Sequence, residues 1–226
     1  MNVYDTFYHS FTPLQLLILI KIHFEILAMK NSRKLKDEQM RSILFEYYES
    51  QEKRLRFFEE FPLGRKTRSD ALLVTETEMI GFEFKSDRDT LKRLERQVHD
   101  YERFCDRNYL VTGQKYKDKA PDEIPEHWGI YVVYLDNEET LQLECVRKAQ
   151  PNTKRMRFHN QLRLLWRSEL IPLIRKYQLG GVTRKNKLEL VRTLEHNLEK
   201  EVLRRELLDT LIERDYSIYA ANDEAE

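Results

Sequence analysis

Three residues near the middle of the chain, Asp70, Glu83 and Lys85, have the chemical types that metal-assisted hydrolysis of a phosphodiester uses. Residues 71–75 and 79–85 are strand-like apolar segments on either side of a short polar turn, which predicts an antiparallel hairpin. A turn centred between residues 76 and 77 places Asp70 opposite Glu83. Alternate residues of a strand share a face, so Lys85 projects on the same side. The pattern therefore gathers two carboxylates and one amine.

This predicted cluster suits one hard cation, Mg²⁺ or Mn²⁺. Opposed side chains in a sheet have Cβ atoms about 4.5–5.5 Å apart, and a cation held between two carboxylates removes their repulsion. It would polarise a phosphoryl oxygen and acidify a bound water, while Lys85 orients that water or stabilises negative charge. A surface hairpin with an acidic pair and a lone lysine has the same spacing, so the pattern alone leaves both interpretations open.

The residues around the hairpin also resemble a known signature. Arg68-Ser69-Asp70, followed after a hairpin-length gap by Gly81-Phe82-Glu83-Phe84-Lys85-Ser86, is similar to the motif of the PD-(D/E)XK nuclease superfamily. The elements expected over residues 37–112, namely helix, three strands, helix and strand, follow the order of that superfamily. The chain departs from the motif at Ser69, where the name-giving proline stands.

The resemblance implies both a fold and an activity. The implied fold is α/β, a restriction-endonuclease-like αβββαβ core with a mixed sheet flanked by helices. The implied activity is that of a metal-dependent nuclease, in which Asp70 and Glu83 bind Mg²⁺ or Mn²⁺ and act in catalysis together with Lys85.

The helix expected after the lysine extends the resemblance. Arg93, Gln97 and Tyr101 are spaced by four residues, so they share one helical face. In similar proteins this face borders the metal site. The resemblance then implies that Gln97 is catalytic and that Arg68, Arg93 and Tyr101 contact nucleic acid.

By the same resemblance, a further glutamate upstream of the aspartate completes the site as a catalytic residue and metal ligand. Glu60, at the end of the first expected strand, is the preferred candidate. Glu59 and Glu46 are its competitors.

A second feature is a basic segment near the C-terminus. Residues 154–187 carry ten basic side chains and a single acidic one, although the whole chain has 39 of each sign. Such a block predicts a polyanion-binding surface or, equally, a solvated helical face. Residues 170–194 weakly resemble the helix-loop-helix of SAP-type DNA-binding modules, and an ordinary helical hairpin explains their leucines as well. The candidate nucleic-acid contacts here are Arg175, Lys176, Arg184, Lys185 and Lys187.

Three regions are expected: an N-terminal helical segment over residues 1–36, a nuclease-like domain over 37–150, and a basic helical extension with an acidic tail over 151–226. The predicted helices are 12–31, 37–51, 89–104, 158–177 and 186–214. The predicted strands are 55–61, 71–75, 79–85, 109–112, 128–135 and 141–149.

The remaining sequence features narrow the class of protein. The longest apolar run, residues 16–20, is far shorter than the roughly 20 residues of a membrane span, and no secretory signal precedes it. We therefore expect a cytoplasmic protein whose partner is nucleic acid, with DNA expected before RNA, no membrane, and a homodimer left open. The alternatives are a non-catalytic nucleic-acid-binding protein that retains the nuclease fold, and a helical protein-interaction scaffold.

Overall fold

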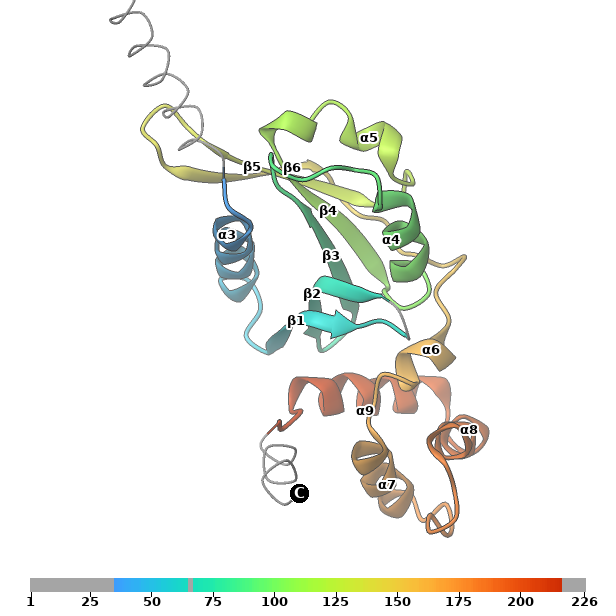
Figure 1. The fold of residues 1–226 in the computed structure, drawn as a ribbon. Coiled ribbons are helices and arrows are strands. Elements are labelled where there is room, and N and C mark those ends of the chain that lie inside the picture. The colour runs from blue at the N-terminus through green and yellow to red at the C-terminus, as the bar shows by residue number, and fades with distance from the viewer. Residues whose placement is uncertain (1–34, 65–66, 217–226) are drawn as a thin grey trace, which may run out of the picture.

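The computed structural model describes residues 35–64 and 67–216, so the expected helix 12–31 and the acidic tail lie outside the described residues. A six-stranded mixed sheet in the order β1-β2-β3-β4-β5-β6 forms the centre (Figure 1). β3, β4 and β5 are parallel neighbours, and the other adjacent pairs are antiparallel. The strands are β1 (Leu55–Pro62), β2 (Arg68–Thr75), β3 (Met79–Lys85), β4 (Arg107–Gly113), β5 (Gly129–Leu135) and β6 (Leu141–Arg147).

Helices cover both faces of this sheet. α3 (Asp37–Glu49) packs Met40 and Leu44 on one face, against the odd-numbered β2 residues Ala71 and Leu73. α4 (Leu94–Tyr101) and α5 (Ala120–Glu123) lie on the other side in Figure 1. The expected mixed α/β architecture flanked by helices is confirmed, and α3-β1-β2-β3-α4-β4 reproduces the predicted order of elements.

Two local differences from the predicted elements surround α4. The helix is shorter than the predicted 89–104 because the Asp89 carboxylate accepts hydrogen bonds from the Ser86 backbone N–H (2.8 Å) and hydroxyl (2.6 Å), which makes a turn there. The predicted loop after β4 contains a short 3₁₀ helix, η2 (Gln114–Tyr116), as well as α5.

Between residues 151 and 216 the chain forms four helices where two were predicted: α6 (Phe158–Leu162), α7 (Arg167–Lys176), α8 (Lys187–Asn197) and α9 (Lys200–Ile212). Glu169 accepts the backbone N–H of Trp166 at 2.6 Å and so starts α7 as a new helix. Leu198 is extended and packs against the core, which separates α8 from α9. Between α7 and α8, Gly180 has a φ of +94°, as a glycine that ends a helix can.

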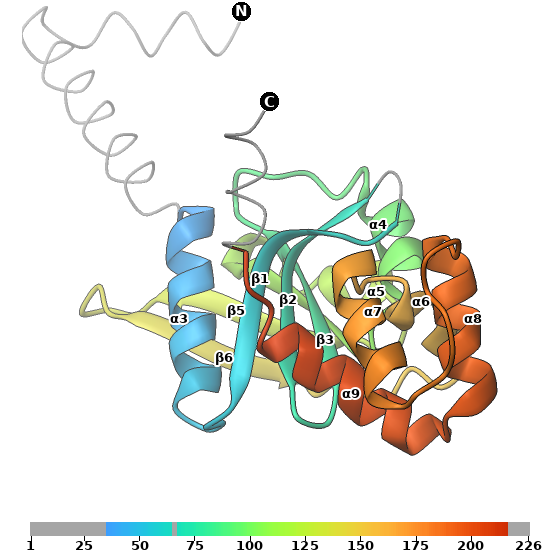
Figure 2. The same ribbon diagram turned by 90° about the horizontal axis from the view of Figure 1, so that it is seen from below.

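These helices share a hydrophobic core with the sheet. Leu207 and Leu211 of α9 belong to the same buried cluster as Leu72 and Val74 of β2. Figure 2 shows α9 crossing in front of β1, β2 and β3, with α7 and α8 beside it. No helix of the described residues is long and apolar enough to cross a membrane.

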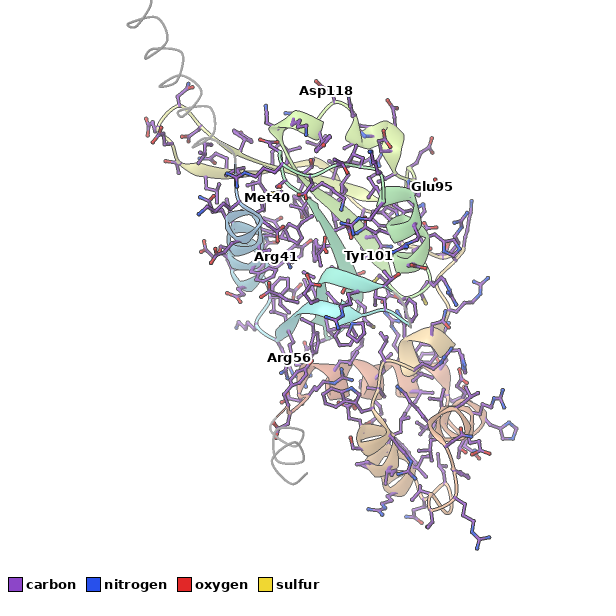
Figure 3. All side chains as sticks on the ribbon, in the orientation of Figure 1. Met40, Arg41, Arg56, Glu95, Tyr101 and Asp118 are labelled. Atoms are coloured by element: carbon purple, nitrogen blue, oxygen red, sulfur yellow. The ribbon has the colours of Figure 1, made fainter. Side chains whose placement is uncertain are left out.

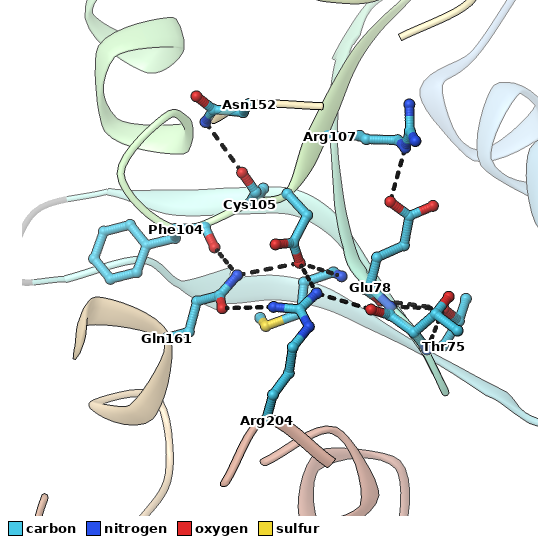
Figure 4. Close-up of polar contacts among 11 residues, drawn as sticks. Thr75, Glu78, Phe104, Cys105, Arg107, Asn152, Gln161 and Arg204 are labelled. Carbon is cyan, nitrogen blue, oxygen red and sulfur yellow. Dashed lines mark hydrogen bonds and ion pairs between the residues drawn. The ribbon is translucent and has the colours of Figure 1, made fainter. Parts of the chain in front are cut away.

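A polar network fixes α6 and α9 to the turn end of the β2–β3 hairpin (Figure 4). The Asp106 Oδ2 atom accepts from Arg204 Nη2 (2.9 Å), Gln161 Nε2 (3.2 Å) and the Met79 backbone N–H (2.8 Å). Arg204 also donates to the Thr77 carbonyl at 2.8 Å. One part-buried carboxylate therefore joins three parts of the chain.

Candidate active site

The predicted hairpin register is present. Ala71 pairs with Phe82 and Leu72 with Gly81, so the next pair along the two strands is Asp70 and Glu83. This pair lies at the end of the hairpin away from its turn, where Asp70 Oδ2 accepts the Phe84 backbone N–H at 2.9 Å.

Glu83 and Lys85 lie on the α4 side of the sheet. Glu83 is fully buried and Lys85 is 6% exposed. The Lys85 ammonium makes an ion pair with Glu83 Oε1. Phe84 between them belongs to the core on the opposite, α3 face. The predicted sharing of one face by the acid and the amine therefore holds.

Burial governs the electrostatics of Glu83. Desolvation, reinforced by the nearby Asp70 carboxylate, raises the pKa of Glu83 to about 7, and the opposing effect of Lys85 does not cancel this rise. The second carboxylate oxygen, Oε2, is buried and accepts no hydrogen bond from any described residue. An ionised oxygen in such a position is costly unless a cation or donor compensates it.

Tyr101 has a different role from the one expected. Its side chain is fully buried, accepts the Asp70 backbone N–H at 2.8 Å and donates to the Phe82 carbonyl at 2.9 Å. Figure 3 labels Tyr101 on the sheet side of α4. A Cβ atom at Gly81 would lie 2.6 Å from the Tyr101 ring, so glycine permits this close approach. Tyr101 thus positions the two strands and is not exposed for contact with nucleic acid.

A cavity of about 440 Å³, here called the carboxylate cavity, opens over these side chains. Gln97, predicted to border the site, lines it, and its Oε1 atom is buried without a partner among the described residues. The lining residues used below are Asp37, Arg41, Glu60, Asp70, Glu83, Lys85, Arg88, Arg93 and Gln97.

Of the upstream glutamates, Glu60 lines the cavity and Glu59 and Glu46 do not. The β1–β2 register places Glu60 across from Asp70, and its φ of 48° is unusual for a residue with a side chain. The Glu60 side chain is 60% exposed, with Oε1 3.9 Å from Arg41 Nη2. Glu59 lies 3.4 Å from the same arginine, and Glu46 is exposed on α3 outside the cavity. No three acidic, histidine or cysteine side chains of residues 35–64 and 67–216 gather closely enough to hold a metal.

Arg41 is a cavity residue that the sequence analysis missed. Its Nε donates to Asp37 at 2.7 Å, its Nη1 donates to the Asp70 carbonyl, and its guanidinium lies 4.8 Å from the centre of the Phe84 ring. Figure 3 labels it on the sheet side of α3. In the sequence, an acid and an arginine four residues apart on a helix indicate only a surface ion pair. Nothing in that spacing predicts that Arg41 also contacts β2.

The donor set fits Mg²⁺ or Mn²⁺. Mg²⁺ in proteins keeps several waters and takes one or two carboxylates together with substrate phosphates. Asp70 and Glu83 are the two carboxylates that would hold such an ion, and the buried Glu83 Oε2 has no hydrogen-bond partner among the described residues.

A second cavity of about 540 Å³, here called the arginine cavity, adjoins the first and shares Glu60, Asp70, Arg93 and Gln97 with it. Arg68, which the sequence analysis selected, lines this second cavity together with Arg96, which it did not.

The basic residues selected near the C-terminus are spread over α7, α8 and the loop between them. Lys176 binds Glu206 at 2.6 Å, and Lys185 donates to Thr193 at 3.1 Å. Lys187 is half-buried, and burial together with the charges of Arg214 and Arg163 lowers its pKa. Arg175 and Arg184 are exposed and make no side-chain hydrogen bond or ion pair with another described residue.

The fold and the side chains define a mixed α/β protein with a recessed site of two carboxylates and one lysine. The chain belongs to the bacteriophage P4 protein cII family, whose model matches residues 30–222. No curated protein matches the chain. A solved structure, described as SPO1766 protein of unknown function from Silicibacter pomeroyi, is similar at 18% identity over 57% of this chain and 86% of that chain, with a TM-score of 0.37. Neither description names a biochemical activity.

Proposed function

We propose that the protein is a nuclease that uses Mg²⁺ or Mn²⁺ to hydrolyse phosphodiester bonds of nucleic acid, with DNA as the expected substrate. The observation that carries the proposal is the buried, unpartnered Oε2 of Glu83 beside Asp70 and Lys85 in the carboxylate cavity. The resemblance of these strands to the PD-(D/E)XK signature, together with the α3-β1-β2-β3-α4-β4 order, supports it.

The side chains have distinct parts in this reaction. A cation bound by Asp70 and Glu83 would polarise the phosphoryl oxygen and acidify a water. The Phe84 N–H fixes the Asp70 carboxylate, and Tyr101 holds the backbone of both strands. Lys85, no longer needed to neutralise Glu83, holds the attacking water or the developing negative charge. Gln97 accepts a hydrogen bond from water or substrate through its vacant Oε1.

Two measurements test this function together. Purified protein is incubated with labelled single-stranded and duplex DNA in Mg²⁺, in Mn²⁺ and in chelator, and Mn²⁺ is titrated into the protein by calorimetry. We expect strand cleavage that the chelator abolishes, and saturable Mn²⁺ binding that Asp70→Asn removes. Absence of both cleavage and Mn²⁺ binding would contradict the proposal.

A second candidate function is non-catalytic binding of nucleic acid on the same fold. The observation that favours it is the ion pair between Lys85 and Glu83, in which each group already neutralises the other. DNA binding without cleavage and without Mn²⁺ affinity is the outcome that this candidate expects.

A further inference from the structure

Three arginines stand around the arginine cavity without partners. Arg68 lies at the start of β2, and Arg93 and Arg96 lie at the start of α4. All three side chains are exposed, and none makes a hydrogen bond or an ion pair with another described residue. Glu60 and Asp70 also line the cavity, but no carboxylate of the described residues forms an ion pair with any of the three arginines.

Several other arginines of the described chain are paired with carboxylates. Arg41, Arg54, Arg107, Arg155, Arg204 and Arg214 each bind at least one carboxylate within 4.0 Å. Further exposed arginines of the described residues have no such partner either, among them Arg163, Arg175, Arg184, Arg192 and Arg205. Arg68, Arg93 and Arg96 differ from these five because all three line one cavity, and a cluster of unpaired guanidinium groups is suited to the phosphates of a polyanion.

The cavity leads to reactive groups that lie below the surface. It shares Asp70 and Gln97 with the carboxylate cavity, in which Glu83 is fully buried and Lys85 is 6% exposed. A duplex is stiff over about 150 base pairs and presents its phosphates on a convex surface. A single strand bends freely and follows a positively charged groove. A phosphodiester can therefore reach Glu83 and Lys85 most readily when it belongs to a single strand.

We propose that Arg68, Arg93 and Arg96 bind the backbone phosphates of a single-stranded nucleic acid and direct that strand into the carboxylate cavity. The inference rests on the proposed function for the fate of the strand, but the binding itself needs no metal. It assigns the substrate class, a single strand or a single-stranded end, and it adds Arg96 to the binding residues.

Binding measured in chelator tests the arginine cavity in the absence of metal-dependent cleavage. A labelled oligothymidylate is titrated into the wild-type protein and into the triple variant Arg68→Gln, Arg93→Gln, Arg96→Gln over a range of salt concentrations. Each phosphate contact on a single strand contributes a slope of about −0.7 to log affinity against log salt. We expect the triple variant to bind roughly tenfold or more weakly and to lose about two units of slope.

A matched variant controls for net charge. Arg163, Arg192 and Arg205 are also exposed and have no side-chain hydrogen bond or ion pair with a described residue, but they lie on the C-terminal helices away from the cavity. Their replacement by glutamine should leave the affinity within about twofold and the slope unchanged. The proposal would be overturned if both triple variants lost the same affinity, or if the variant of Arg68, Arg93 and Arg96 bound with wild-type affinity.

Competition with duplex tests the strand preference. We expect an unlabelled single strand to displace the probe at a lower concentration than a duplex of the same length, and equal displacement would overturn the assigned substrate class. The outcomes also separate the two proposals. If binding depends on the three arginines but no cleavage occurs, only the proposed nuclease activity is contradicted. If metal-dependent cleavage is unaffected by replacing the three arginines, only the proposed binding role of the arginine cavity is contradicted.

Discussion

The carboxylate cavity and the basic C-terminal segment were both selected from residue types, yet the structure treats them differently. Asp70, Glu83 and Lys85 come together on one side of the hairpin, because their positions follow from strand period and register. The basic side chains of 154–187 do not converge. Lys176 is neutralised by Glu206, and the pKa of Lys187 is lowered by burial. Spacing along a strand therefore predicts which side chains lie close together. A count of charges does not predict which of them are free to bind a ligand, because the residue that neutralises a charge can lie elsewhere in the chain.

The largest expected effect concerns the two carboxylates. The double variant Asp70→Asn, Glu83→Gln should reduce the rate of metal-dependent cleavage by roughly 10³-fold or more, since a catalytic metal contributes several kcal/mol to the transition state. The measurement is the initial rate of cleavage of a labelled single strand. Glu46→Gln, which changes an exposed carboxylate of α3 outside the cavity, is the control and should retain the wild-type rate. If the double variant cleaves at the wild-type rate, the carboxylate cavity is not the catalytic site, and it no longer differs in this respect from the basic C-terminal segment.

The next effect is on stability and depends on pH. Because the folded-state pKa of Glu83 is raised from its ordinary value of 4.5 to about 7, the folded state retains the proton more tightly than the unfolded state. Stability should therefore be greatest at low pH within this window and fall as the pH rises from about 4.5 to about 7. The loss should approach about 3 kcal/mol.

Glu83→Gln removes this titration. In chelator, urea unfolding should show that the variant lacks the decline between pH 5 and pH 7 that wild type shows. The same decline in both proteins would mean that Glu83 is not the titrating group.

A third prediction asks what the C-terminal helices do for the fold. Arg204→Ala removes the ion pair with Asp106 and the hydrogen bond to the Thr77 carbonyl, so it should lower the free energy of unfolding by about 1.5–3 kcal/mol. Chemical denaturation measures this, with Arg205→Ala, at an exposed position next to it, as the control. If both variants unfold alike, α9 is not fastened to the hairpin by this network.

Elements that depend on local spacing were predicted correctly, and those that depend on contacts distant in the chain were not. Strand positions, the hairpin register and α3 came from local period and capping, and the structure has them at nearly the predicted bounds. The single helix predicted over 158–177 is instead two helices, because Glu169 accepts the Trp166 N–H and starts a new one. No glycine marks this break in the sequence. The Glu169 side chain also forms an ion pair with the distant Arg214 at 2.7 Å, which the local sequence does not predict.

The candidate site shows the same limit. The sequence predicted which residues share the face of the hairpin, but not that the Tyr101 hydroxyl is occupied by the backbone of Asp70 and Phe82, nor that Arg41 reaches across from α3. Both contacts depend on how helices pack against the sheet. The upstream glutamate remains a prediction, because Glu60 faces Asp70 by register while its side chain stays exposed beside Arg41.

The smallest expected effect is the final test of the comparison. Lys176 has its charge compensated by Glu206. Lys187 is half-buried, and burial together with the charge of Arg214 lowers its pKa, so we expect neither ammonium to bind a phosphate backbone. The double variant Lys176→Gln, Lys187→Gln should therefore bind oligothymidylate with an unchanged salt slope. Its stability should change by less than about 1 kcal/mol, since an exposed ion pair such as Lys176 with Glu206 contributes little. If the slope instead flattens by about 0.7 for each lysine, Lys176 leaves Glu206 and Lys187 leaves its half-buried position to bind phosphate. The basic segment would then act as a binding surface that assembles only on nucleic acid, and its charge count would have been the better guide.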